Sequence, residues 1–442
     1  RFLFFRASLP RDRFLPQRVA GHLARVPGKD GQFPGMESEI RGLIEEVIRL
    51  GHRANPYDLT LRLIDNQQSA DISLLVQLVL EQGAVAGTFF ADAISFVPEQ
   101  ELPRLAGLAV DRLPLTSAEE FLAHCSLQQV QALHPFLSKI WDREPNRECY
   151  FYDWPWRESG LTQFDYLKQI VEQGTESSRR ARENLLETRH PAILQFCAGR
   201  PDISAHDLLE VGFSATLDQL YTSETWHLVF PADFWSQPDP PPHLRKRHPT
   251  WIGQGMERTE PFPFGGQGSH LCAVCGQPGH RLFSLENVPV HVPLAQLGPI
   301  RLETCLSCLG WEVPCLFYVH GEDGKISPCA YDAEVLVPQF SAPPLREAEV
   351  QLAHTPARWR WQDWALANGR QNLHRVGGYP CWIQDADYLN CPHCQDTMSF
   401  LFQLDSHLPL MDGSEHLWGS GGICYAHWCA RCQVSGYSWQ CT

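Results

Sequence analysis

Eight of the sixteen cysteines form four Cys-x-x-Cys pairs, all of them beyond residue 270. The first two pairs are separated by 29 residues and the last two by 34. A Cys-x-x-Cys turn directs two thiolates at one metal ion, and two such turns complete the tetrahedral shell that zinc prefers in structural sites. Four pairs in two matched sets therefore predict two structural zinc sites. The eight predicted ligands are Cys272, Cys275, Cys305 and Cys308, followed by Cys391, Cys394, Cys429 and Cys432.

The sequence leaves the grouping of these pairs open. Each half can close its own site, or the pairs can combine across the halves. A redox role needs a single Cys-x-x-Cys at a helix start beside a strand, which four pairs do not match. A site closed by four cysteines has no open position for water or substrate, so no catalytic and no cofactor-binding residue is assigned. Four histidines lie near the pairs and could replace a thiolate: His270, His280, His393 and His427.

The residues that follow the first pair of each half are similar. The segment LFSLE (282–286) and the segment LFQLD (401–405) both begin seven residues after the second cysteine of their pair. This alignment without a gap predicts two copies of one module, at about 269–345 and 375–442. Each copy would contain a knuckle, a strand, a connection and a second knuckle. The alternation in LFQLD predicts a strand with one buried face.

A stretch rich in Trp and Arg lies between the two copies. Thr355 as N-cap, Pro356 in the first turn and Gly369 after the end predict a helix, on which Trp361 and Trp364 share a face. Interleaved aromatic and basic side chains can stack nucleic-acid bases. Because Trp more often anchors a core, packing is the favoured interpretation.

The region 36–230 has the pattern of an all-α helical array. Apolar residues recur at spacings of three and four, and the connections between the periodic segments are brief. We find no fixed repeat period that would support a solenoid. The predicted helical segments are 40–48, 71–83, 99–111, 118–125, 127–141, 164–173 and 177–188.

Two segments differ in composition from the rest. Residues 1–35 carry six Arg and one Lys against two Asp, and Met36 is the first methionine. They are interpreted as a basic leader or, preferably, as an over-long start. Residues 231–268 are rich in Pro and Gly and predict a linker or an irregular wrapping segment. Its basic cluster, 245–248, is interpreted as a solvated loop.

Charge and composition limit the function classes. The 442 residues carry a formal net charge of −15, which argues against non-specific nucleic-acid binding. No apolar run reaches the roughly 18 to 20 residues that a membrane-spanning helix needs. Cysteine pairs at metal-ligand spacing favour a reducing compartment, so we expect a cytoplasmic localisation.

Several segments of the second copy resemble a known family. They are RVGGYPCWIQ (375–384), CPHC (391–394) with Met398, FLFQLDS (400–406), the glycines of 419–422 with Tyr425, CARC (429–432) and the Trp439-Gln440 pair. Together they resemble the YwqG-like domain-of-unknown-function family. A looser similarity, through the GG-x-P-x-W turn and the following cysteine pattern, extends to the programmed cell death protein 2 group.

The resemblance covers about 370–442 directly and 265–370 through the duplication. It does not cover the helical region. It implies a partner-binding role, like that of toxin-immunity proteins or of chaperones dedicated to a ribosomal protein, and it implies no catalytic residues.

We therefore predict an α+β protein. Its all-α array would precede a duplicated, mainly antiparallel β domain, 269–442, with two four-cysteine zinc-knuckle sites. The predicted function is protein binding, and the acidic charge suits a basic client. Alternatives are an enzyme with a pocket between the helical and zinc-binding regions, and nucleic-acid binding through the Trp/Arg helix. The carboxylates and bases available to an enzyme show no catalytic spacing: Asp363, His374, Asp385, Asp387 and Asp405.

Overall fold

The structure is a computed structural model, and it describes most of the chain beyond residue 68. The described residues are 69–83, 89–143, 152–235, 258–285, 300–322, 324–331, 335–367 and 371–442, with Gly42, Glu45 and Arg49, which are helical. The basic leader, the cluster 245–248 and most of the predicted helix 40–48 lie outside these residues. The chain divides into two units, 1–39 and 40–442, and the description below concerns the second.

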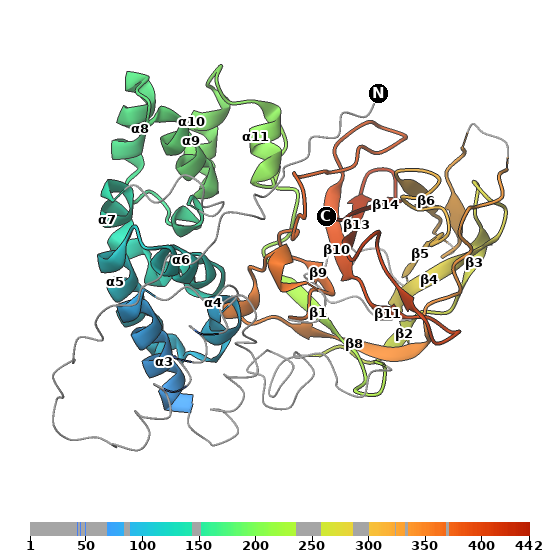
Figure 1. Ribbon diagram of the computed structural model, residues 1–442. Coiled ribbons are helices and arrows are strands. Elements are labelled where there is room, and N and C mark those ends of the chain that lie inside the picture. The colour runs from blue at the N-terminus through green and yellow to red at the C-terminus, as the bar shows by residue number, and fades with distance from the viewer. Residues whose placement is uncertain are drawn as a thin grey trace. The chain divides into compact units, whose positions relative to one another are not determined.

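Helices form the first part of this unit, as the sequence predicts (Figure 1). They are α3 (Ser69–Gln82), α4 (Phe89–Ala93), α5 (Leu102–Arg112), α6 (Thr116–Gln129), α7 (Leu137–Asp142), α8 (Phe164–Gln173), α9 (Ser178–Glu187), α10 (Pro191–Ala198) and α11 (Ala205–Glu210). In α5 the buried residues recur at helical spacing along one face, namely Leu102, Leu105, Ala106, Ala109 and Val110. None of the described helices is both long and apolar enough to cross a bilayer.

One predicted helix, 127–141, is interrupted in the structure. After α6 ends at Gln129, two short 3₁₀ turns cover Val130–Ala132 and His134–Phe136 before α7 begins. Pro135 lies in the second of these turns, where it has no N–H for a continuous helix. The prediction of one helix is wrong there because periodicity alone does not register this break.

The rest of the unit is built on a large antiparallel sheet. Its strands are β1 (Thr225–Val229), β2 (Phe262–Phe264), β3 (Gln267–Leu271), β4 (Pro278–Leu285), β5 (Ile300–Thr304), β6 (Leu316–His320), β7 (Ile326–Pro328), β8 (Ala348–His354), β9 (Arg375–Gly377), β10 (Ser399–Asp405), β13 (Ile423–Cys429) and β14 (Val434–Gln440). Their order is β3-β4-β2-β8-β1-β9-β10-β13-β14-β6-β7, and β5 pairs with β4. A separate pair joins β11 (Leu408–Pro409) to β12 (Glu415–His416). The α+β class, with helices preceding an antiparallel sheet, is thus confirmed.

Two strands lie in segments for which the sequence predicted other structure. Thr225–Val229, within the region assigned to the helical array, forms β1 and pairs with β8 and β9. Phe262–Phe264, within the predicted linker, forms β2 and pairs with β4 and β8. Both strands depend on partners that lie far away along the chain, so local composition carries little signal for them.

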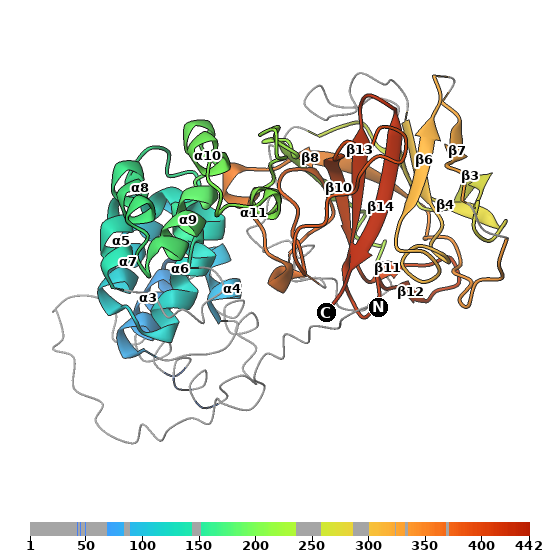
Figure 2. The same ribbon diagram turned by 90° about the horizontal axis from the view of Figure 1, so that it is seen from above.

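The predicted half-burial of the LFQLD strand is wrong. Six of the seven residues of β10 and all seven of β13, its neighbour in Figure 2, are buried. Phe402 and Leu404 belong to one core cluster, whereas Phe400 and Tyr425 belong to another. Both faces of this strand pair are therefore covered.

The predicted helix that starts at Thr355 is also wrong. The chain instead forms two 3₁₀ turns, Ala357–Trp359 and Trp364–Leu366, and 368–370 lie outside the described residues. Between the turns the backbone is extended at Asp363, whose Oδ1 accepts a hydrogen bond from the second turn. The Arg358 guanidinium donates to the Ile94 carbonyl oxygen at 2.7 Å. Such tertiary contacts override the local helix signals.

The turn after β2 gives a direct test of the sheet packing. Gly265 has a φ of +72°, and a Cβ added there would lie 2.3 Å from the Arg346 carbonyl oxygen. Gly324 has a φ of +74°, but a Cβ added there meets no atom within 4 Å. We expect Gly324→Ala to lower the free energy of unfolding by the backbone strain alone, about 1 to 2 kcal/mol. Gly265→Ala should lower the free energy of unfolding by the same backbone strain and by about 1 to 3 kcal/mol more, because the added Cβ conflicts with the Arg346 carbonyl. Chemical denaturation measures both, and equal losses would contradict the packing described here.

Candidate metal centres

The first candidate centre gathers the thiols of Cys272, Cys275, Cys305 and Cys308. Their four Sγ atoms lie within 4.8 Å of one another, and all four residues are buried. The first pair follows β3 and the second follows β5. Both strands hydrogen-bond to β4, which therefore aligns the two cysteine turns at one end of the sheet.

The second candidate centre gathers Cys391, Cys394, Cys429 and Cys432 in the same way. Their Sγ atoms also lie within 4.8 Å of one another, although Cys394 and Cys432 are only partly buried. The first pair precedes β10; in the second pair, Cys429 ends β13 and Cys432 lies in the turn before β14. Because β10 pairs with β13, the two turns again meet at one end of neighbouring strands.

The structure therefore brings together all eight of the predicted ligands and groups them within each half. In both groups, thiols of different turns are in contact. Cys275 Sγ lies 3.8 Å from Cys305 Sγ, and Cys394 Sγ lies 3.7 Å from Cys429 Sγ. Of the two groupings that the sequence allows, these distances fit closure within each half.

The first turn of each group has the same hydrogen-bonded backbone. The Cys272 N–H donates to the Gln277 carbonyl at 2.8 Å, and the Cys391 N–H donates to the Asp396 carbonyl at 2.9 Å. The residue after the second cysteine is left-handed in both, with a φ of +68° at Gly276 and +62° at the equivalent Gln395. This turn directs both of its sulfurs toward the opposite pair.

The charges in each group show why a cation fits there. Hydrogen bonds from the Cys305 and Cys308 thiols lower the pKa of Cys272 to about 2. Burial acts to raise the pKa of Cys391, but backbone N–H groups that include that of Cys394 hold it below its ordinary value. In each group the first thiol is thus favoured to ionise. Ionising all four so close together requires a cation, because the thiolates would otherwise repel one another.

The four nearby histidines stay outside both groups. His270 Nδ1 lies 2.8 Å from a carboxylate oxygen of Glu303, and both ring nitrogens of His280 contact backbone groups. His427 is buried and stacks on Trp382 at a ring distance of 6.1 Å. His393 Nε2 lies 3.9 Å from Cys329 Sγ. Thiols alone make up each candidate ligand set.

Three of the five carboxylates and bases considered for an enzyme, Asp363, His374 and Asp405, are buried. Asp405 is buried and its N–H donates to His374 Nδ1 at 3.2 Å, whereas Asp363 caps a 3₁₀ turn. Asp385 and Asp387 are exposed.

The sequence did not predict a cavity that charged and aromatic residues of several segments line together, although an enzymatic pocket was among the hypotheses. Glu158, Arg189, Tyr221, Arg360 and Trp361 help to line a cavity of about 280 Å³. They come from separate segments, and the local signals are the Trp/Arg stretch that contains Arg360 and Trp361 and the charged pair that follows the tryptophans in WPWRE, 154–158.

Comparison with known proteins gives one relative for part of the chain. The chain is 28% identical over 211 aligned residues to the uncharacterized protein YpfL of Salmonella typhimurium (strain LT2). The alignment covers 43% of this chain and 44% of that relative, which is less than half of the length of either protein. No protein-family model matches the chain, and no solved structure matches it. The resemblance to the YwqG-like family and to the programmed cell death protein 2 group stays a prediction.

Proposed function

We propose that the chain is a protein-binding module of the cytoplasm that two structural zinc ions stabilise. Four sulfur ligands in a closed group are typical of structural zinc, and hard cations such as Mg²⁺ or Ca²⁺ require oxygen ligands instead. Each ion would tie the turns at one end of neighbouring strands. Metal binding and folding of these turns would then be coupled.

We also propose that the two halves arose by duplication of one module. Phe283 and Phe402 occupy the same offset after their cysteine pairs, and their rings are 4.8 Å apart. The strands that follow the second cysteine pair of each half, β6 and β14, pair with each other. These contacts are what two related modules would make about an approximate twofold axis.

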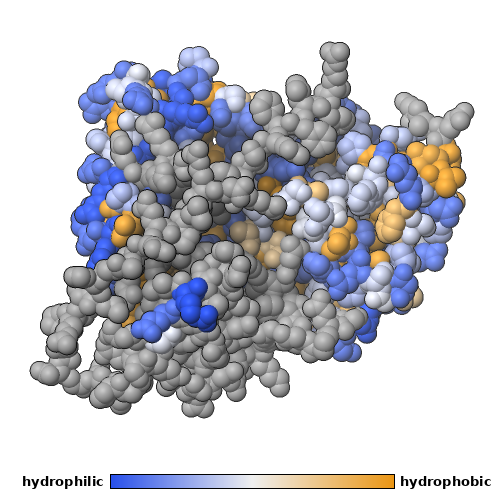
Figure 3. Space-filling view, viewed as in Figure 1, coloured by the Kyte–Doolittle hydropathy of each residue, from blue (hydrophilic) through white to orange (hydrophobic). Residues whose placement is uncertain are grey.

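The observation that carries the binding role is an exposed apolar surface around the first cysteine group. Its five members have exposed fractions between 46% and 92%. In Figure 3, apolar residues are visible at the end of the sheet that contains β3 and β4. We call this surface the knuckle patch, and it consists of Leu271, Trp311, Val335, Val337 and Phe340.

The segment 335–340 is held against the cysteine turns. The Leu336 N–H donates to the Val274 carbonyl at 3.0 Å, and Leu336 packs against the core. The Gln339 N–H donates to a carboxylate oxygen of Glu312 at 2.6 Å. With Leu336 directed inward, its neighbours Val335 and Val337 are directed outward, as in an extended chain. Exposed apolar groups held in place in this way are typical of a contact site.

The proposed partner is a basic protein that presents an apolar anchor. The formal charge of −15 would attract a basic partner over long range, and the knuckle patch would supply the apolar contact. Such a partner fits an immunity-like or chaperone-like task. An enzymatic role and nucleic-acid binding stay as alternatives.

A capture experiment tests the binding role. The full chain, tagged and purified without chelator, is used as bait in a lysate of its native host, and stoichiometric partners are identified by mass spectrometry. We expect a basic protein, and we expect Val335→Glu combined with Val337→Glu to reduce its recovery at least tenfold by burying two carboxylates in the contact. Leu161→Glu, at a residue of the helical region with an exposed fraction of 57%, should leave recovery unchanged. Equal recovery by both variants would contradict the assigned surface.

A further inference from the structure

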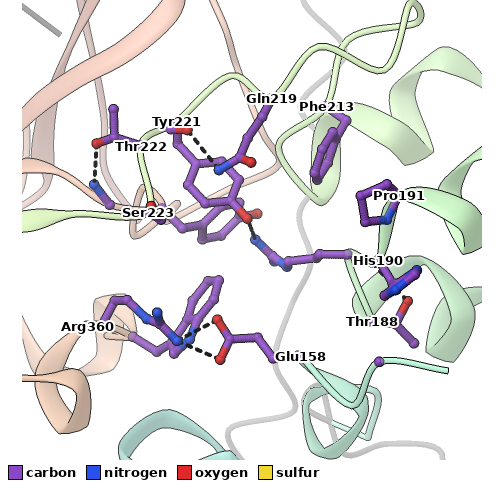
Figure 4. Close-up of a pocket in the computed structure, with 15 residues that line it drawn as sticks. Glu158, Thr188, His190, Pro191, Phe213, Gln219, Tyr221, Thr222, Ser223 and Arg360 are labelled. Carbon is purple, nitrogen blue, oxygen red and sulfur yellow. Dashed lines mark hydrogen bonds and ion pairs between the residues drawn. The ribbon is translucent and has the colours of Figure 1, made fainter. Parts of the chain in front are cut away.

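A cavity of about 280 Å³ lies between the helical segments and the sheet, away from both cysteine groups. Its lining comes from the segment before α8, from the turn between α9 and α10, from the residues before β1, and from the segments before and after β9. Figure 4 shows Glu158 joined to Arg360 on one side of the cavity, with Tyr221 and Phe213 on the other.

Aromatic rings form much of the cavity wall. The Tyr221 ring lies 5.4 Å from the Tyr379 ring and 6.5 Å from the Trp361 ring. The Tyr379 ring is held in place by its hydroxyl, which donates to the Glu210 carbonyl. These rings provide flat surfaces on which a planar group can stack.

A buried guanidinium lies among these rings. The carbon at the centre of the Arg189 guanidinium is 4.0 Å from the Tyr379 ring centroid and 4.7 Å from that of Trp361. Arg189 donates to Glu187 at 3.3 Å, and Arg157 donates to the same carboxylate. One buried carboxylate thus serves two guanidiniums.

The charges around the cavity do not balance. Arg360 is paired with Glu158 at 2.5 Å, so three guanidiniums stand against two carboxylates among these five residues, namely Arg157, Arg189, Arg360, Glu158 and Glu187. Asp153 ionises less readily than a free carboxyl, because burial and the charge of Glu187 raise the pKa of Asp153. These five residues therefore carry one net positive charge, and the Arg157 and Arg189 side chains that share Glu187 are buried, where the field of a charge is weakly screened.

From the aromatic wall and the surplus positive charge, we propose that this cavity binds a small planar anion. The ring of the ligand would stack among Tyr221, Trp361 and Tyr379, and its anionic group would compensate the surplus charge beside Arg189 and Arg360. A carboxylate and a phosphate share this chemistry. The cavity volume suits one ligand of about the size of an aromatic acid or a mononucleotide.

Calorimetric titration of the full chain tests this site with two matched pairs of probes. The first pair is 4-hydroxybenzoate and its neutral amide, and the second is AMP and adenosine. We expect one saturable site with at least tenfold higher affinity for the anion of one pair than for its neutral partner. The pair that shows this preference identifies carboxylate or phosphate as the anionic group. Saturation by neither anion, or equal affinities within both pairs, would overturn the proposal.

Variants at the Glu158–Arg360 pair give opposite predictions. Glu158→Gln removes a negative charge from the lining and should strengthen binding of the anion severalfold. Arg360→Gln leaves Glu158 unpaired and should weaken it at least tenfold, whereas the neutral analogue should respond to neither change. The control is Arg179→Gln, at a side chain of α9 that is 82% exposed, and it should have no effect. If Glu158→Gln and Arg360→Gln each changed the affinity for the neutral analogue as much as the affinity for the anion, the cavity would not be an anion site.

If Arg360→Gln does not fold, Trp361→Phe provides a second test of the same site. This variant retains a flat ring, so calorimetry should still detect the anion. The quenching of tryptophan fluorescence by the ligand should decrease, because Trp361 lines the cavity. Unchanged quenching would place the ligand elsewhere and overturn the assignment.

Discussion

Cys391→Ser should reduce the metal content of the purified chain from two ions to one. The four Sγ atoms of the second group lie within 4.8 Å of one another, so the loss of one leaves an incomplete tetrahedral shell. Structural zinc contributes on the order of 10 kcal/mol of apparent binding free energy in small zinc domains. Loss of a third of that would lower the Tm of the unit 40–442 by roughly 4 °C, because the entropy of unfolding is about 2.1 cal/mol/K per residue. Elemental analysis and a thermal scan measure the two effects.

The control is a cysteine outside both groups. Cys315 is partly buried and belongs to neither candidate centre. Cys315→Ser should therefore keep both metal ions and nearly the full Tm. If Cys391→Ser also retained two ions and an unchanged Tm, the second group would not be a structural metal site.

Glu187→Gln should destabilise the unit by about 3 to 5 kcal/mol. The Glu187 carboxylate is buried and accepts hydrogen bonds from both Arg157 and Arg189. Removing its charge leaves two buried guanidiniums without a counter-ion, and the loss of one partner from a buried ion pair typically costs this much. Denaturant titration at neutral pH measures the free energy of unfolding.

The destabilisation should depend on pH in a defined direction. Burial acts to raise the pKa of Glu187, but the charges of Arg157 and Arg189 outweigh it and lower this pKa. The ionised carboxylate therefore stabilises the folded chain above its unfolded pKa of about 4.3. This contribution is lost as the pH falls through the folded value, so wild type and Glu187→Gln should converge in acid.

The control for this prediction is an exposed carboxylate. Glu172→Gln breaks the ion pair with Lys168 on the surface of α8, where both side chains are well exposed. Such pairs contribute at most about 0.5 kcal/mol. A similarly small loss for Glu187→Gln would mean that the buried cluster is not formed as described.

The candidate metal centres were predictable because the residues that define each cysteine turn are close together in the sequence. Each Cys-x-x-Cys turn is a short segment with its own hydrogen-bonded backbone, and four of them repeat in two matched sets. Helices α8 and α9 were predictable for the same reason, since periodicity along one segment defines them. In these elements nearby residues determine the structure.

The parts of the fold and of the cavity that the sequence did not predict depend on contacts between distant segments. The β1 strand pairs with β8 more than a hundred residues later, and the Trp/Arg stretch forms short turns because Arg358 is held by the Ile94 carbonyl. The charge cluster beside the cavity combines Arg157 with Glu187 and Arg189 from another helical segment. No single stretch of sequence contains the geometry of such a cluster.

The most direct test of the central claim is the metal content and metal environment of the wild-type chain. The chain is purified without chelator, and elemental analysis is combined with X-ray absorption at the zinc edge. We expect two zinc ions per chain, each with four sulfur ligands at about 2.3 Å. A chain that folds without metal, or zinc bound mainly by nitrogen or oxygen, would contradict the assignment of both four-cysteine groups as structural zinc centres.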